Sequence, residues 1–183
     1  GAMHVLLLGL NYYPDKLGNA PLMTGLCEGL VKRGHRVTVV CAFPHHETGQ
    51  IESGYRGKLF ARDQHNGVDI LRVWLYAPEG GKVAKMANYA SFTTTALAAA
   101  STVSDIDVIF TPSPPLTLGI VDQAISRFRK VPFVYNLQDL FPEAAIRLGV
   151  MTNPLMVGAF EQLERWVYRK ATHLSVISEG FRR

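Results

Sequence analysis

Residues 4–41 decide the fold, and they read HVLLLGLNYYPDKLGNAPLMTGLCEGLVKRGHRVTVVC. Residues 4–10 form a continuous apolar run, which is typical of a strand buried on both faces of a sheet. Residues 21–33 carry leucines at helical spacing and are followed by Gly34, a common helix stop. Residues 36–41 predict a second strand. A strand, a helix and a strand joined by short returns predict a right-handed crossover between parallel strands.

The remainder of the chain continues the alternation of strands and helices. Two strand-like segments, residues 60–64 and 68–74, flank Asn66-Gly67, the strongest short-range signal of a β-hairpin. We expect this hairpin to be an excursion from the main sheet. Further strands are expected at residues 107–111, 131–137 and 173–178, and helices at residues 82–103, 117–130 and 153–170. The sum is an α/β fold, a doubly wound, mostly parallel, Rossmann-like sheet with a β-hairpin excursion.

The composition is that of an ordinary globular domain. The chain has 183 residues, of which 48% are apolar and 19% charged, enough for one buried core. Gly1-Ala2 before Met3 resembles a protease scar and is set aside. Cys27 and Cys41 lack metal-ligand spacing, so we expect both to be reduced and buried, as in a cytoplasmic protein. The formal net charge of +4 favours anionic partners, among them phosphorylated ligands, acidic lipid and nucleic acid.

The segment after the first strand, residues 11–21, is a candidate anion site. It contains neither a G-x-G-x-x-G turn nor a P-loop lysine, which argues against dinucleotide-dependent dehydrogenases and P-loop NTPases. Gly18 and Asn19 stand just before a predicted helix, where free backbone N–H groups and the helix dipole can hold a phosphate or sugar oxygen. A plain turn and helix cap is the alternative interpretation.

Two further loops carry polar side chains. The second strand leads into His45, His46 and Glu47. Because adjacent loop residues rarely bind one metal ion together and no third ligand is evident, we expect substrate contact or loop structure here and no metal. Ser113 lies in a proline-rich turn, residues 111–115, which follows another strand and displays hydroxyl groups.

The most informative loop follows the strand at residues 131–137 and reads QDLFPE, residues 138–143. It carries Gln138, Asp139 and Glu143 beyond the carboxyl end of a buried strand, where ligands sit in open α/β sheets. Helix capping is the alternative role for Asp139. Four strands thus end in polar loops at one edge of the predicted sheet, which is what a binding cleft needs.

Short motifs follow one another along nearly all of residues 3–183. They are YYP at 12–14, GNAP at 18–21, GHRVTV at 34–39, FPHHETG at 43–49, YRGK at 55–58, TPSPP at 111–115, DLFPE at 139–143 and YRKA at 168–171. Together they resemble the N-terminal domain of retaining GT-B-fold glycosyltransferases of family 4, also called group 1. The likeness is closest to enzymes of bacterial surface polysaccharide synthesis, including amino-sugar fucosyltransferases of O-antigen and colanic-acid pathways. Two positions depart from the family pattern: Gly18-Asn19 replaces a Gly-Gly pair, and Gln138 replaces a histidine.

This resemblance implies a two-domain enzyme of which residues 1–183 are the acceptor-side, Rossmann-like domain. A C-terminal domain outside this chain would bind the nucleotide-sugar donor, and the acceptor would be a glycan or a polyprenyl-linked sugar. No cofactor besides the donor and no nucleic acid is implied, and the isolated domain should be inactive. Asp139 is the first candidate for orienting or deprotonating the acceptor hydroxyl, and His46 is the second. The remaining candidates for substrate binding are Tyr13, Gly18, Asn19, His45, Ser113, Gln138 and Glu143.

The helix at residues 82–103 suggests a membrane contact. One edge carries basic and aromatic side chains, namely Lys82, Lys85, Met86, Tyr89 and Phe92. Such an edge can rest on an acidic lipid surface, which would place the enzyme at the inner face of the plasma membrane. An ordinary helix packed on the sheet is the alternative.

Two other functional classes compete with the transferase. A nucleotide-sugar-modifying Rossmann enzyme would need the glycine-rich turn that residues 11–21 lack. A non-catalytic module that binds a carbohydrate or phosphate ligand would be compatible with the same loops.

Overall fold

The structure is a computed structural model, and it describes residues 2–16, 20–44, 51, 53–76, 82–112, 117–137 and 173–176. Its strands are β1 His4–Leu8, β2 Arg36–Ala42, β3 Phe60–His65, β4 Val68–Val73, β5 Val108–Pro112, β6 Phe133–Leu137 and β7 His173–Val176. Its helices are α1 Ala20–Lys32, α2 Lys82–Ser101 and α3 Leu118–Arg129, with a 3₁₀ turn, η1, at Ser53–Tyr55. The predicted helix at residues 153–170 lies outside the described residues.

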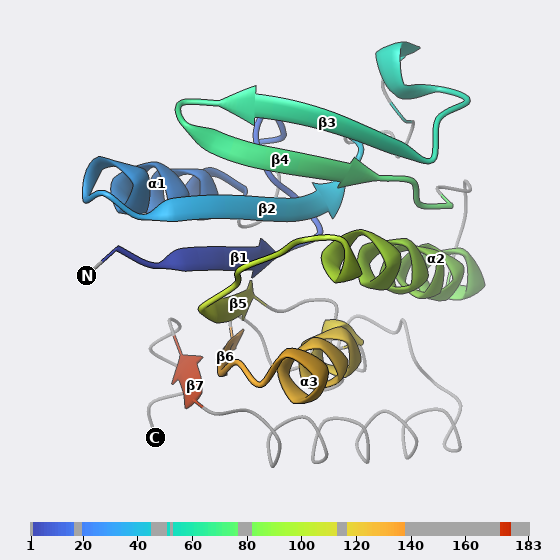
Figure 1. The fold of residues 1–183 in the computed structure, drawn as a ribbon. Coiled ribbons are helices and arrows are strands. Elements are labelled where there is room, and N and C mark those ends of the chain that lie inside the picture. The colour runs from blue at the N-terminus through green and yellow to red at the C-terminus, as the bar shows by residue number, and fades with distance from the viewer. Residues whose placement is uncertain are drawn as a thin grey trace.

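The strands form one seven-stranded sheet in the order β3-β4-β2-β1-β5-β6-β7 (Figure 1). Every neighbouring pair is parallel except β3 and β4. In the centre of the sheet Leu6 of β1 is in register with Thr38 of β2 and Ile109 of β5. The predicted doubly wound, mostly parallel α/β fold is therefore confirmed.

Helices cover both faces of the sheet, α1 on one side and α2 with α3 on the other (Figure 1). All five residues of β1 are buried. Leu6 and Leu8 belong to the cluster that includes α2 and α3, whereas Val5 and Leu7 belong to the cluster that includes α1. Successive side chains of a strand point to opposite faces, so a strand covered on both faces needs an unbroken apolar run.

The predicted hairpin forms, but it is part of the main sheet. Asn66 and Gly67 both have positive φ, 49° and 81°, and His65 pairs with Val68 across the turn. Because β4 also pairs in parallel with β2, the hairpin extends the sheet and β3 becomes its edge. The expected excursion is thus wrong in its placement: hydrogen bonding of β4 to β2 satisfies backbone groups that an isolated hairpin would leave open.

Two helices present faces that differ from the predicted ones. In α1 the side chains in the core are Met23 and Cys27, while Leu22 is 54% exposed. In α2 Phe92 is fully buried, so it packs on the sheet and is not part of a membrane-facing edge. The side chains of Lys82 and Lys85 lie outside the described part of the chain. None of the described helices is long and apolar enough to cross a membrane.

Candidate functional site at the carboxyl edge of the sheet

Parallel pairing brings the carboxyl ends of six strands to one edge. Pro112 at the end of β5 is in register with Asn136 of β6, and Leu8 at the end of β1 is in register with Val40 of β2. Ligands of open α/β sheets bind beyond this edge, in the segments that leave the strands. The described segment after β1, residues 11–16, lies here. It is anchored by Tyr12, whose ring is buried in the α1 cluster.

A buried arginine organises this region. Arg72, near the end of β4, is only 3% exposed. Its Nε donates a 2.5 Å hydrogen bond to Asp63 of β3, and its Nη2 donates one of 2.5 Å to the backbone oxygen of Tyr13. Its Nη1 lies 3.6 Å from the sulfur of Cys41 in β2. One guanidinium group therefore joins three strands to the segment that follows β1.

Tyr55 of η1 completes this cluster. Its hydroxyl donates a 2.7 Å hydrogen bond to the same oxygen of Asp63 that accepts from Arg72. Its ring lies 5.9 Å from the Arg72 guanidinium carbon and stacks on Phe43, with 5.2 Å between the ring centroids. The 3₁₀ turn η1 is thereby tied to the same cation.

The positive charge of Arg72 and the negative charge of Asp63 stabilise each other. Partial burial raises the pKa of Asp63, but the hydrogen bonds from Tyr55 and Arg72 and the charge of Arg72 outweigh this effect, and the pKa lies below its ordinary value. Burial raises the pKa of the Cys41 thiol to about 12. At neutral pH Asp63 is therefore ionised and Cys41 is a neutral thiol, as Cys27 is in the core for the same reason.

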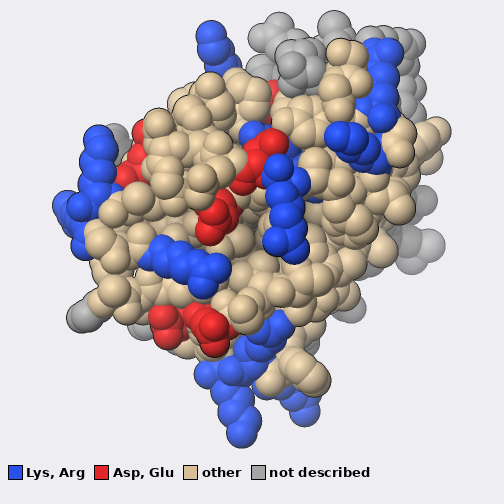
Figure 2. Space-filling model, turned by 45° about the horizontal axis from the view of Figure 1, so that its top comes forward, with Lys and Arg blue, Asp and Glu red and all other residues tan. Residues whose placement is uncertain are grey.

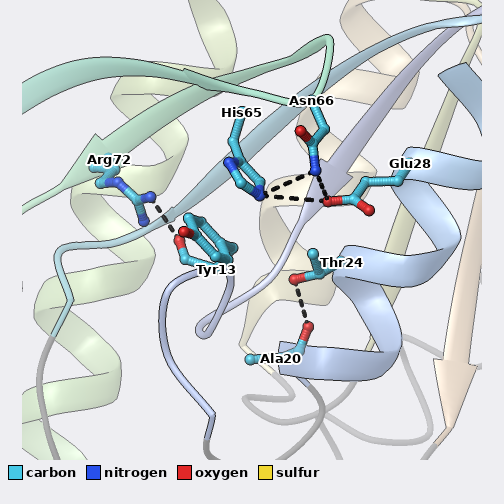
Figure 3. A network of polar contacts seen from close by, with 7 residues as sticks. All are labelled: Tyr13, Ala20, Thr24, Glu28, His65, Asn66 and Arg72. Atoms are coloured by element: carbon cyan, nitrogen blue, oxygen red, sulfur yellow. Dashed lines mark hydrogen bonds and ion pairs between the residues drawn. The ribbon is translucent and has the colours of Figure 1, made fainter.

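Tyr13, a predicted substrate contact, lies against the β3–β4 turn (Figure 3). Its ring stacks on His65 with 3.6 Å between centroids and 5° between planes, and Tyr13 remains 42% exposed. The Nε2 atom of His65 is 3.5 Å from Glu28 of α1, and Asn66 donates a 2.8 Å hydrogen bond to that carboxylate. The ring of Tyr13 is thus held against His65 while the residue stays partly exposed to solvent.

A second buried polar pair stands at the end of β5. Thr111 donates a 2.5 Å hydrogen bond to Oδ1 of Asp122 in α3, and both side chains are fully buried. Oδ2 of Asp122 has no hydrogen-bond partner among the described residues. Burial raises the pKa of Asp122 well above its ordinary value and thereby favours the neutral carboxyl group, while the hydrogen bond from Thr111 acts in the opposite direction.

Two adjoining hollows over β2, β3 and β4, beside the end of α2, are less suited to a charged ligand. The larger, of about 310 Å³, lies toward the start of β2 and β4, and the smaller, of about 160 Å³, lies over β3 and the end of β4. Arg36 and Arg62 line the larger one together with Asp63 and Asp69, so the formal charges cancel. Figure 2, which brings the β3 side forward, likewise shows basic and acidic side chains interleaved. In the described part of the chain, no group of three His, Cys, Asp or Glu side chains could hold a metal ion.

A family model for the glycosyl transferase 4-like domain matches residues 18–183. The chain belongs to the glycosyl transferase 4-like family. Among solved structures it is similar to sucrose-phosphate synthase from Thermosynechococcus elongatus, with a TM-score of 0.61 and 12% identity over 94% of this chain and 41% of that one. At this identity the likeness shows the fold alone. A weaker likeness, with a TM-score of 0.48 and 14% identity over 97% of this chain and 46% of the other, is to UGT2 from Phytolacca americana.

One curated protein shares a shorter stretch with this glycosyl transferase 4-like domain. It is an uncharacterized 42.6 kDa protein in the cps region of Klebsiella pneumoniae, 36% identical over 70 residues. These residues are 38% of this chain and 16% of that protein. The glycosyl transferase 4-like domain thus spans less than half the length of the relatives and structures to which it is similar.

Most of the predicted site residues lie outside the described part of this glycosyl transferase 4-like domain. They are Gly18, Asn19, His45, His46, Ser113, Gln138, Asp139 and Glu143. The described strands that precede them, β2, β5 and β6, end at the same edge as β1. Sequence reasoning did not find Arg72 or Asp122. Asp122 had a local signal, a carboxylate beside Leu118, Val121 and Ile125 on the apolar face of a helix, whereas Arg72 had none.

Proposed function

We propose that this domain is the acceptor-side half of a retaining glycosyltransferase that transfers a sugar from a nucleotide-sugar donor. The observation that carries the proposal is the family match over residues 18–183. The polar segments at the carboxyl edge of the sheet, where α/β enzymes bind their ligands, support it. The acceptor in this proposal is a glycan or a polyprenyl-linked sugar of a bacterial surface polysaccharide. The 70-residue likeness to a Klebsiella pneumoniae protein supports the bacterial setting.

The donor would be held mainly by a second domain beyond residue 183. Bond cleavage builds negative charge on the diphosphate leaving group. Gly18 and Asn19 immediately precede α1, which begins at Ala20. Free backbone N–H groups at a helix N-terminus, with the positive end of its dipole, stabilise such charge without a metal ion.

The acceptor hydroxyl needs a fixed orientation and a proton acceptor. In this proposal Asp139 orients or deprotonates it, and His46 is the second candidate. In a retaining reaction on one face of the sugar, the leaving phosphate itself can accept the proton. The role of Asp139 would then be orientation. Tyr13, which is 42% exposed, contacts the sugar in this proposal.

A binding experiment on residues 1–183 tests whether this domain binds the acceptor and leaves donor binding to a second domain. Backbone amide NMR spectra would be recorded with a pool of oligosaccharides released from bacterial surface polysaccharide, and separately with UDP, GDP and dTDP. We expect the oligosaccharides to shift amides at the carboxyl edge, among them Tyr13 and Thr111, and to leave Arg36 and Asp69 at the opposite half unchanged. Tight binding of a free nucleotide by residues 1–183 would contradict the acceptor-side assignment. Shifts confined to the hollow beside Arg36 and Asp69 would contradict the location.

A further inference from the structure

The partners of Arg72 come from β3, from β2 and from the segment after β1, and only one of them, Asp63, carries a charge that balances the guanidinium group. A guanidinium group buried to 3% exposure is costly unless its charge and donors are matched. One carboxylate, Asp63, supplies the charge balance at 2.5 Å. The Nη2 atom of Arg72 donates to a backbone oxygen, that of Tyr13, 59 residues away in the sequence. Neutralisation alone does not need this second bond.

The second bond adds a hold at Tyr13 to a segment that is anchored at the adjacent residue by the buried ring of Tyr12. Tyr13 is 42% exposed, and its ring stacks on His65 of the β3–β4 turn. Arg72 and His65 both belong to the β3–β4 hairpin. Figure 3 shows the hairpin holding Tyr13 at two points, the backbone through Arg72 and the ring through His65. The hairpin therefore fixes the position of Tyr13 in the segment that follows β1.

We propose that Arg72 is a positioning residue of the transferase reaction. It touches no substrate and acts by fixing Tyr13. The proposal rests on the proposed function, in which Tyr13 contacts the sugar. Asp63 keeps the guanidinium plane oriented toward the Tyr13 oxygen, and Tyr55 holds Asp63 in place, since Tyr55 and Arg72 both donate to Oδ2 of Asp63.

The test uses Arg72→Lys, with Arg62→Lys as a matched control. Lysine keeps the charge but lacks the planar fork that binds Asp63 and Tyr13 together. Arg62 lies on the same hairpin, and no described residue forms a hydrogen bond or ion pair with its side chain. Tyr55→Phe is a milder second variant, which keeps Arg72 and removes one hydrogen bond to Asp63.

The first readout is the NMR signal of the His65 ring protons in residues 1–183. A tyrosine ring stacked at 3.6 Å shifts these signals upfield, and a merely structural Arg72 would leave the shift in place in every folded variant. We expect Arg72→Lys to lose the upfield shift, Tyr55→Phe to reduce it and Arg62→Lys to retain it. If the Lys variant does not fold, the Tyr55→Phe variant decides this readout.

The second readout is steady-state transfer by the enzyme that includes the donor-binding half. We expect kcat to fall by about 10- to 100-fold in Arg72→Lys, the scale of a small misplacement of reacting groups, with KM changed less. Arg62→Lys should match the unmodified enzyme. An unchanged His65 signal, or an unchanged kcat in a folded Arg72→Lys enzyme, would overturn the positioning role. Absence of transfer by the unmodified enzyme would refute the proposed function instead, and the His65 signal would still decide whether Arg72 holds Tyr13.

Discussion

Replacing Gly67 by alanine would strain the turn on which Arg72 and His65 depend. Gly67 has a φ of 81°, and a Cβ atom there would lie 2.8 Å from Cγ1 of Val31 in α1. The left-handed backbone costs about 1–2 kcal/mol for a residue with a side chain. Overpacking against Val31 adds about 1–3 kcal/mol. We therefore expect Gly67→Ala to lower the free energy of unfolding by roughly 2–5 kcal/mol.

Urea unfolding of residues 1–183 measures this loss, and a double-mutant cycle separates its two parts. Val31→Ala removes the clashing methyl group, so the pair Gly67→Ala/Val31→Ala should recover the overpacking part, about 1–3 kcal/mol, while the backbone part remains. Gly25→Ala is the control, because a Cβ atom there meets nothing within 4 Å in the middle of α1 and should stabilise the helix slightly. A loss below about 0.5 kcal/mol for Gly67→Ala, or no coupling to Val31, would refute the reasoning.

Three further predictions concern carboxylates. Burial raises the pKa of Asp122 above its unfolded value, so its contribution to the free energy of unfolding is complete below about pH 4 and falls as pH rises. Asp122→Asn should flatten this fall in urea midpoints measured from about pH 4 to 8. An unchanged slope would contradict a raised pKa for this carboxyl group. The pKa of Asp63 is lowered in the folded protein, so its contribution to the free energy of unfolding is present above about pH 4 and is lost as pH decreases through the folded pKa. Asp63→Asn should be destabilising at about pH 7 and approach the stability of the unmodified protein near pH 2. An equal loss of stability at both pH values would argue against ionisation as the cause. In the enzyme with both domains, Asp139→Asn should melt nearly normally and lose about 100- to 10,000-fold in turnover; early melting with near-normal transfer would make Asp139 a helix cap.

Much of the fold follows from local sequence patterns. The continuous apolar run of β1 predicts burial on both faces, and Asn66-Gly67 predicts the hairpin because both positions adopt positive φ. The placement of that hairpin was not predictable, because pairing of β4 with β2 joins segments separated along the chain and leaves no periodic signal in either one. In α1, Met23 and Cys27 rather than Leu22 face the sheet, since the buried stripe is displaced by one position from the leucine stripe.

The candidate site was predictable only in part for the same reason. Polar loops after successive strands indicated the carboxyl edge, and the parallel register confirms that β1, β2, β5 and β6 end there together. Arg72 escaped detection because its partners come from three distant segments. In sequence it occupies one position of an apolar strand, where an arginine is usually read as solvent-exposed.

Sugar transfer itself is the most direct test of the central claim. The reading frame extended past residue 183 to include a second α/β domain would be incubated with nucleotide sugars and a polyprenyl-linked oligosaccharide extract, beside residues 1–183 alone. NMR would assign the anomeric configuration of the product. We expect acceptor-dependent transfer with retained configuration by the extended protein and none by residues 1–183. Transfer by residues 1–183 alone, or an inverted product, would contradict it.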